Sequence, residues 1–439
     1  GGAVVGGADG AASSGLLFER EVLIAGARLS SSWVFHASTE LQVGAWISGW
    51  VQWAQRPTLG GASQMGHGLA DVEYRAGDAV SLFARSGYFR ERRDNGKAST
   101  IDGAAEANST RWTTLAGGVD VLLPDAGTLQ LRAFGDVETF RSNFLAVPAA
   151  SPPRSVGRMT LDQSVPVHAA GGSAQWARTI GRAHLLTAGV DLRRVDGDSR
   201  EDALDAVTGQ RIVTRRVSGG TQTSAGLFVQ DLVTPAPKLV ITIGARVDRW
   251  RNHDGHNLET NVATGQPTAG HAPLLAGRSD TAISPRAGVM YHVTDRVSAW
   301  GNLGWGFRAP TLNELYRQFR VGTVLTLANH QLGRERLLGG EAGLNVALAR
   351  GLTWRATWFA NRVANPVSNV TVAVAGSQIT RQRRNLGATR VSGLQTDLER
   401  PGGTLALPDR ERGFHRSGRG VAWTAHALQA PVFEQQRRY

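Results

Sequence analysis

The feature that most restricts the fold of this chain is a rhythm of segments and connections between residues 70 and 403. The segments are about ten residues long, close to the ~9–11 that a tilted strand needs to cross hydrocarbon, and apolar and polar side chains alternate along them. The connections are alternately short, at 76–78, 124–127, 180–182, 235–237, 294–295, 350–351 and 401–403, and long, at 91–110, 140–165, 195–221, 251–281, 307–340 and 363–384. This asymmetry predicts a sheet whose strands turn tightly at one end and loop widely at the other.

The two faces of the strands indicate which environment each face meets. In residues 239–248, Leu239, Ile241 and Ile243 share one face, and segments 129–138 and 186–193 repeat the pattern. An antiparallel sheet with one face in water would alternate in the same way, but aromatic residues end several strands where a membrane-interface girdle belongs. They are Tyr88, Phe89, Phe140, Trp250 and Trp305. We therefore predict an all-β fold, a transmembrane antiparallel β-barrel of outer-membrane type with long exterior loops and short periplasmic turns.

The expected strands divide the chain into three parts. About thirteen strands fit between 70 and 400, and because bacterial barrels usually have an even number, at least one strand lies outside this window or is miscounted. Residues 20–55 offer further strands with poorer alternation, and after 404 only 421–423 looks strand-like. We expect an N-terminal segment at 1–69 with the first barrel strands, a barrel at 70–403 and an atypical C-terminal segment at 404–439.

Composition excludes several classes of protein. No cysteine occurs among the 439 residues, which excludes disulfides, thiolate metal sites and cysteine nucleophiles. The net charge of +12 is carried by arginine, since only Lys97 and Lys238 are lysine, but the arginines are scattered, so no nucleic-acid partner is expected. The sequence contains no run of about 18 apolar residues, so no transmembrane helix is predicted. The first residues lack the pattern of a signal peptide.

Between residues 282 and 345 the sequence resembles a known family. The resemblance is carried by Ser284-Pro285-Arg286, by Gly306 to Thr311 with Glu314-Leu315-Tyr316, and by Asn329, Leu332, Glu335, Arg336, Leu337, Gly340, Glu341 and Gly343. Together with 227–250 and 384–399, these phrases resemble, in the same order, the barrel of TonB-dependent outer-membrane receptors. The resemblance implies structural roles for Ser284, Pro285, Arg286, Gly306, Phe307, Pro310, Glu314, Glu335, Glu341 and Gly343.

The resemblance also implies a function. It suggests a receptor and transporter in the bacterial outer membrane for TonB-dependent uptake of a ferric siderophore, with cobalamin as the second ligand class. The implied partners are the TonB energy-transducing complex, outer-membrane lipid and lipopolysaccharide, and the implied barrel is no enzyme and holds no cofactor. The family's barrel has 22 strands and follows an N-terminal plug and a TonB-binding segment. Neither is recognisable here, and 1–5 resembles at best the end of a plug, so the chain is expected to be partial relative to the family.

Ligand capture is expected in one long exterior loop. Its guanidinium and aromatic groups suit a carboxylate- or catecholate-rich iron chelate. They belong to Arg308, Tyr316, Arg317, Phe319 and Arg320. The alternative for this loop is an ordered structure whose arginines bind lipopolysaccharide phosphate or one another. For the whole chain, the alternatives are a passive or structural outer-membrane barrel and a nonfunctional fragment of a receptor.

Other constellations indicate structure rather than chemistry. Charge pairs on the polar strand face, such as Arg246 with Asp248 and Arg132 with Asp136, predict an ion-pair lattice inside the barrel. The loop 253–256 contains two histidines and an aspartate, but the next histidine is distant, so hydrated loop residues are favoured over a metal site. The acidic run at 196–202 lacks a calcium-binding register, the glycines at 301–306 precede no helix, and no serine-hydrolase motif occurs.

Overall fold

The structure of the protein is a computed structural model. It describes residues 13–19, 22–38, 41–56, 59–147, 156–205, 207–400 and 421–425, and side chains are described for 64–147, 156–205 and 207–399. Almost all of the described chain is β-strand. In this part of the chain, no helix has the length and apolarity to cross a membrane.

Eighteen strands form the main sheet, and four form a second, smaller sheet. The main sheet consists of β1 (Ser13–Glu19), β2 (Val22–Ser38), β3 (Leu41–Arg56), β4 (Leu59–Ala76), β5 (Val80–Ala98), β6 (Ala105–Leu123), β7 (Gly127–Ala146), β8 (Arg158–Ile180), β9 (His184–Leu204), β10 (Ile212–Ala236), β11 (Leu239–Asn261), β12 (Ala272–Leu275), β13 (Arg278–Thr294), β14 (Val297–Arg308), β17 (Glu335–Ala349), β18 (Leu352–Ala364), β21 (Ala388–Arg400) and β22 (Val421–Ala425). The second sheet contains β15 (Phe319–Val321), β16 (Val324–Leu327), β19 (Val367–Ala375) and β20 (Gln378–Asn385), and α1 (Leu312–Tyr316) is the helix of the described chain.

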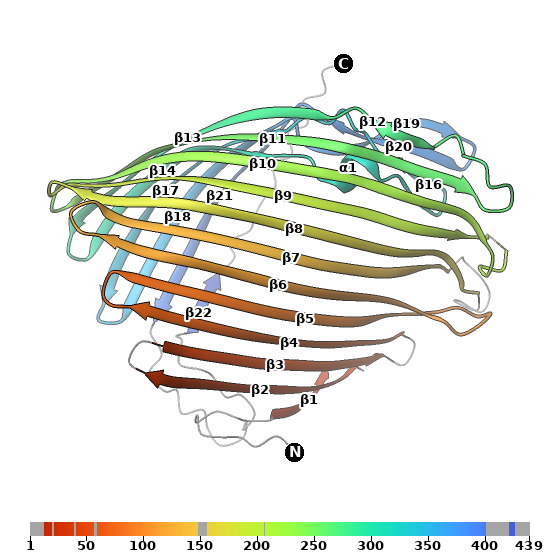
Figure 1. Cartoon of the computed structure of the whole chain (residues 1–439), viewed down its shortest axis with the longest axis horizontal. Helices are drawn as coiled ribbons and strands as arrows, with labels where there is room; N and C mark the ends of the chain where they lie inside the picture. The colour runs from red at the N-terminus through yellow and green to blue at the C-terminus, as the bar shows by residue number, and fades with distance from the viewer. Residues whose placement is uncertain are drawn as a thin grey trace.

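The main sheet is an antiparallel wall in which each strand pairs with the next strand of that sheet along the chain, except that β11 pairs both with the short β12 and with β13. The pairings run from β1 with β2 to β21 with β22. Figure 1 shows this wall curling, with tight turns at one end and long hairpins, α1 and the second sheet at the other. Within the described ranges, no pairing joins β22 to β1. The predicted all-β, antiparallel, outer-membrane type of fold is confirmed, as a curled wall that is not closed within the described ranges.

Short turns join the strands at six of the seven predicted positions, and the seventh, 401–403, lies outside the described residues. β4 and β5 are joined through Gly77, whose φ of +65° is the left-handed conformation that glycine adopts without strain. Gly127 follows the turn between β6 and β7 with φ +95°, and a Cβ atom there would lie 2.2 Å from the carbonyl oxygen of Ala177. Side-chain bulk is therefore excluded at Gly127 by both conformation and space.

The long connections differ from the prediction because most of their residues are paired strand. Residues 195–221 were expected to form a loop, yet β9 and β10 remain paired from Thr221 with Asp196 to Ile212 with Leu204. Antiparallel pairing satisfies the backbone donors and acceptors beyond the membrane as well as within it, so polar sequence there does not end the strands. The connection between β14 and β17 departs from this pattern, since it contains α1, β15 and β16.

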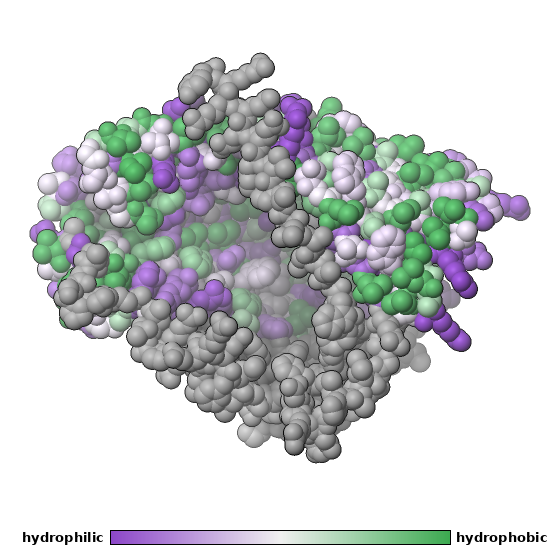
Figure 2. All heavy atoms as spheres, turned by 180° about the vertical axis from the view of Figure 1, so that it is seen from behind, coloured by the Kyte–Doolittle hydropathy of each residue, from purple (hydrophilic) through white to green (hydrophobic). Residues whose placement is uncertain are grey.

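The wall has an apolar outer face. Alternate residues of β10 and β11 expose large side chains, and Leu227, at 62% exposure, lies opposite Val190 on β9 and Val247 on β11. The intervening positions point inward, where Arg246 of β11 bonds to Asp191 of β9. Figure 2 shows hydrophobic residues gathered on the wall and hydrophilic residues visible in the hollow. An oily exterior around a polar interior is the arrangement of a membrane barrel.

The predicted aromatic girdle is only partly correct. Tyr88 is 47% exposed on the outer face, as expected. The prediction for Trp250 is wrong, because this side chain is 4% exposed and stacks on Phe307 with ring centroids 5.0 Å apart. Phe140 is also wrong, since it lines an inner cavity. The physical reason is the period of two along a strand: both residues occupy the inward-facing set of positions.

Candidate functional site

The connection between β14 and β17 begins with α1, a one-turn helix held by a capping box. Thr311 is its N-cap, and the Thr311 hydroxyl accepts a hydrogen bond from the Glu314 backbone N–H at 3.2 Å. The Glu314 carboxylate in turn accepts from the Thr311 backbone N–H at 2.8 Å. Pro310, fully buried, precedes this cap. The sequence Pro-Thr-x-x-Glu therefore specifies where the helix starts.

Arg308 connects the helix to the wall. Its guanidinium donates to Glu314 at 2.8 Å and to Glu335, the first residue of β17, at 2.6 Å. Glu335 also accepts from the Val367 backbone N–H at 2.7 Å. Burial alone would raise the pKa of Glu314, but hydrogen bonds from Arg308 and the Thr311 backbone outweigh burial, so the pKa lies below its ordinary value. Glu314 is thus a carboxylate that is both a helix cap and an ion-pair partner.

An apolar cluster packs the α1 segment against the inner wall. Leu315, Tyr316 and Leu332 are each at most 3% exposed and contact one another. The Tyr316 ring lies over Gly220 of β10 and Gly255 of β11, where a Cβ atom would meet it at 2.9 and 2.4 Å. Glycine at these two strand positions is what allows the ring to approach the backbone.

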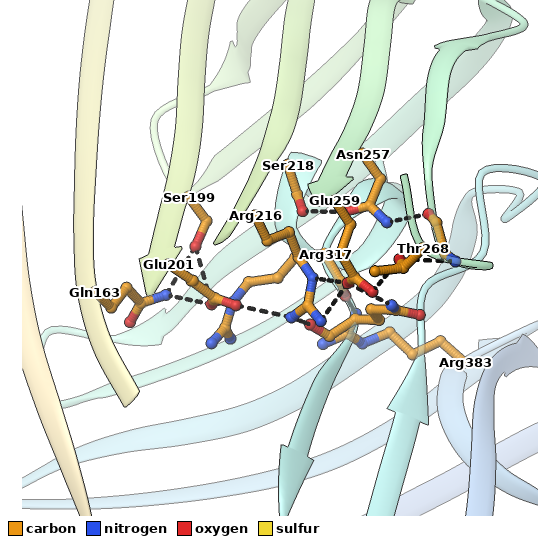
Figure 3. A network of polar contacts seen from close by, with 12 residues as sticks. Gln163, Ser199, Glu201, Arg216, Ser218, Asn257, Glu259, Thr268, Arg317 and Arg383 are labelled. Carbon is orange, nitrogen blue, oxygen red and sulfur yellow. Dashed lines mark hydrogen bonds and ion pairs between the residues drawn. The ribbon is translucent and has the colours of Figure 1, made fainter. Parts of the chain in front are cut away.

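A chain of buried charges continues along the inner wall beside this cluster (Figure 3). Glu201 of β9 is 3% exposed and accepts hydrogen bonds from Arg216 of β10 at 3.0 Å and from Arg317, which follows α1. Arg216 also bonds to Glu259 of β11, and Glu259 accepts from Gln318 at 3.1 Å. Buried charges require such partners, so this network fixes the position of residues 312–318, the inner segment, relative to β9, β10 and β11.

Arg383 holds the segment from the second sheet. Its guanidinium, 8% exposed as a residue, donates to the carbonyl oxygens of Asn313 at 2.9 Å and Arg317 at 2.8 Å. Both Arg383 and Arg317 lie 5.3 Å from the centre of the Phe319 ring. Burial lowers the pKa of Arg383 below its ordinary value. Phe319 is therefore enclosed by two cations, in the geometry of a cation–π contact.

Between the α1 segment and the wall lies a cavity of about 570 Å³. Its apolar lining comes from Phe140 of β7, Val165 and Val167 of β8, and Val195 of β9. Its cations are Arg193 of β9 and Arg317. Arg317 is bonded to Glu201, whereas the guanidinium of Arg193 has no ion pair or hydrogen bond within the described residues. The cavity thus combines apolar walls with one uncommitted positive charge, and its size is typical of small-molecule sites.

The five ligand-contact residues predicted from the sequence occupy different environments. Tyr316 is 3% exposed in the apolar cluster, and Arg308 is held by Glu314 and Glu335. Arg317 lines the cavity, Phe319 is enclosed by arginines, and Arg320 is exposed, with Gln378 at 3.3 Å. The structure therefore brings four of them into one ordered inner segment and leaves Arg320 at its surface.

The motif residues lie on β13, β14, β17 and α1. Ser284, Pro285 and Arg286 lie on β13, and Arg286 bonds to Gln230 across the inner face. Gly306 and Phe307 lie in β14 just before its last residue, Arg308; Pro310 precedes the cap, and Glu314 completes it. On β17, Glu335 binds Arg308 and Glu341 accepts from Asn302 at 3.4 Å. A Cβ atom on Gly343 would lie 2.7 Å from the Ala356 carbonyl oxygen, so this position admits only glycine without a shift of the neighbouring strand.

The predicted inner charge lattice exists with one changed partner. Arg246 bonds to Asp248 at 2.6 Å, as predicted, and also to Asp191. Arg132 was expected to pair with Asp136, but it bonds to Asp120 on the neighbouring strand at 2.6 Å. Cross-strand neighbours are closer than residues four apart along an extended strand.

The histidine loop forms local contacts. His253 lies 2.7 Å from Asp254, and His256 lies 3.3 Å from Asp198. Among the described residues, no three His, Asp, Glu or Cys side chains are arranged to hold a metal ion.

Arg193 is the functional candidate that sequence reasoning missed. Alternation over 186–193 placed it on the polar face, but only the register of β8, β9 and β10 brings it to the cavity. Its place among the inward-facing positions of 186–193 was the available signal, but Asp191 on the same face suggested an ion pair that Arg246 forms instead.

The curled antiparallel wall and the polar, folded inner segment define an outer-membrane β-barrel with a ligand-sized interior cavity. Sequence comparison agrees, because the family model described as "TonB dependent receptor-like, beta-barrel" matches residues 35–430. The chain belongs to this family, whose barrels lie in the bacterial outer membrane. No curated protein sequence matches the chain.

Solved structures share the fold at low identity. The siderophore receptor PirA from Pseudomonas aeruginosa is 14% identical with a TM-score of 0.59, over 87% of this chain and 61% of PirA. The ferric citrate transporter FecA is 16% identical with a TM-score of 0.61, over 88% of this chain and 54% of FecA. The copper transporter OprC is 13% identical with a TM-score of 0.66, over 89% of this chain and 58% of OprC. The chain therefore spans little more than half the length of these proteins.

Proposed function

We propose that this barrel is an outer-membrane receptor for TonB-dependent uptake of an anionic metal chelate of the ferric-siderophore class. Family membership supports the TonB complex as the energy source, and two neighbours in structure are a siderophore receptor and a ferric citrate transporter. Outer-membrane lipid and lipopolysaccharide are the proposed surroundings of the wall. Cobalamin, the other ligand class implied by the sequence, has less support, because a neutral or weakly charged ligand gives no role to the cavity's free cation.

The observation that carries the proposal is the uncommitted Arg193 in the cavity. Several arginines inside the wall have a carboxylate partner, as Arg216, Arg246 and Arg317 do, and Arg286 bonds to Gln230. Arg193 faces the space between Phe140, Val195 and α1 instead. A planar guanidinium can bond to carboxylate or catecholate oxygens with two parallel hydrogen bonds, and the apolar wall can contact the organic part of a chelate.

The proposed contact set follows from this geometry. Arg193 and Arg317 contact the ligand in the cavity, and Arg320 contacts it at the exposed end of the segment. Arg308, Tyr316 and Phe319, which the sequence nominated for contact, instead hold the segment in place.

Binding of anionic iron chelates to the purified protein tests the proposal. We expect Arg193→Gln to weaken binding of a ferric tricarboxylate or tricatecholate at least tenfold, because a charge-assisted hydrogen bond contributes about 1.5–3 kcal/mol. Arg194→Gln is the matched control, since Arg194 is the next residue, points to the outer face and pairs with Asp196. Titration calorimetry or quenching of tryptophan fluorescence measures the affinity.

Three outcomes would overturn the proposal. One is equal binding by the Arg193 variant and its control. Another is equal affinity of the unaltered protein for a neutral chelate. The third is that the protein binds no chelate and that liposomes containing it leak small sugars rapidly, which would indicate a passive barrel.

A further inference from the structure

Four arginines share one patch on the outer face of β5, β6 and β7. On β5, the exposed Tyr88 faces outward, and Arg90 and Arg92, two and four residues further on, share that face. On β6 the outward set contains Leu115, 60% exposed, and Arg111; on β7 it contains Val137, 51% exposed, and Arg141. All four arginines are exposed.

The register of the strands makes these arginines neighbours. Arg90 lies directly opposite Arg111 in the β5–β6 pairing. Arg92 lies opposite Ser109, and Ser109 lies opposite Arg141 on β7. Like charges directly opposite on one face of a sheet are destabilising. The other neighbours give no relief, because β4 places Gly66 and Gln64 opposite Arg90 and Arg92.

Among the described residues, these arginines have no protein partner. Within the part of the chain that the structure describes, none of the four forms an ion pair or a hydrogen bond through its guanidinium. The acids near them on this face are Asp94, which accepts from the Gly96 backbone N–H at 2.9 Å, and Asp162 of β8, which lines the groove opposite Asn143. Two strands away the same outer face is different, since Arg194 pairs with Asp196 and Arg215 with Asp202, each at 2.8 Å.

The patch encloses a shallow groove of about 240 Å³. The four arginines, Ser109 and Asn143 line its outward side and offer hydrogen-bond donors. Arg90 follows Tyr88 by two residues, about 7 Å along a strand at ~3.3 Å per residue. The groove therefore begins where the apolar belt ends, on the side of the long hairpins, which is the depth of lipid headgroups in the outer leaflet.

We propose that this groove binds the phosphate groups of a phosphorylated lipid in the outer leaflet. Phosphate supplies the negative charge that the Arg90–Arg111 pair lacks, and guanidinium forks match its geometry with paired hydrogen bonds. The acyl chains of the same molecule lie along Leu115 and Val137 below the groove. This site is independent of the chelate cavity, because its arginines point to the opposite face of the wall.

Native mass spectrometry of the whole protein in detergent, with a diphosphorylated glycolipid as the probe, tests the site. We expect the double variant Arg90→Gln/Arg111→Gln to bind the lipid at least tenfold more weakly than the unaltered protein. The control is Arg194→Gln/Arg215→Gln, which removes two positive charges from the same face at arginines that form ion pairs with Asp196 and Asp202. In lipid-free detergent, the Arg90/Arg111 variant should melt no lower than the parent, because a repulsion has been removed.

The arms of the experiment separate the alternatives. Retained binding by the Arg90/Arg111 variant, equal loss in the control, or equal affinity for the dephosphorylated lipid would overturn the proposal. Displacement of the lipid by inorganic phosphate at equal concentration would also overturn it, by indicating a free-anion site. Chelate affinity, measured on the same variants, is expected to stay unchanged, so failure here is distinct from failure of the proposed uptake function.

Discussion

Glu201 shows how one side chain on the inner wall can hold a whole segment. It is 3% exposed and joins Arg216 of the wall to Arg317 of the inner segment. Removing one partner of a buried ion pair costs about 3–5 kcal/mol, because the remaining charge stays buried. We therefore expect Glu201→Ala to raise hydrogen exchange of residues 312–318 strongly while the strand pairs of the wall remain protected.

The matched control is Asp202→Ala at the next position. Asp202 pairs with Arg215 at 2.8 Å on the outer face, where both side chains are partly exposed, so its loss should cost no more than about 1 kcal/mol. Unchanged exchange of residues 312–318 in the Glu201 variant would show that the network does not hold the segment.

Single residues also mark the limit of what the sequence can predict. Alternation placed Arg193 and Arg246 on the polar face, which the structure bears out. It could not pair Arg317 with Glu201, because these residues are 116 positions apart and meet only after the β14–β17 connection folds inward. Nor could it reveal that Tyr316 is buried, since that depends on glycines of two distant strands.

At the scale of elements, α1 is a helix whose cap responds to acid. The pKa of Glu314 is lowered in the folded protein, so its contribution to stability is full above the ordinary value of 4.5 and is lost as the pH falls through the lower, folded value. We expect hydrogen exchange of residues 308–318, corrected for intrinsic rates, to stay constant from pH 7 to 5 and to rise below 4.5.

Glu314→Gln tests the assignment of this pH response. Glutamine can still accept the capping bond from Thr311 but cannot form the ion pair with Arg308. Exchange should therefore be faster at pH 7 and rise less in acid, the remaining rise coming from carboxylates such as Glu335, which also binds Arg308. Glu341→Gln is the control, because the Glu341 carboxylate has one hydrogen bond in the described chain, from Asn302, and none to the α1 segment. A Glu314 variant with the original pH profile would contradict the assignment.

Elements were predicted unevenly, for physical reasons. The tight turns were placed correctly because glycine and neighbouring turn residues fix local conformation, as at Gly77. The exterior connections were predicted as loops because their residues are polar, yet β9 and β10 stay paired there. Polarity reports the solvent around a strand, whereas pairing is decided by backbone hydrogen bonds.

At the scale of the whole molecule, the wall separates lipid from a wet interior, and this can be tested on neighbouring strands. Leu227 faces outward on β10, with Val190 and Val247 beside it on the same face. An arginine on the lipid face costs free energy at any depth of the hydrocarbon, up to about 2–4 kcal/mol at the bilayer midplane, whereas lumenal positions meet water. We therefore expect Leu227→Arg to lower the urea midpoint of unfolding from lipid vesicles, while Thr242→Arg, on the inward set of β11, changes it little. Equal midpoints for the two variants would mean that the apolar face does not meet lipid. Because the outer lipid site and the inner chelate cavity are assigned to opposite faces of the same wall, that result would remove the basis of both.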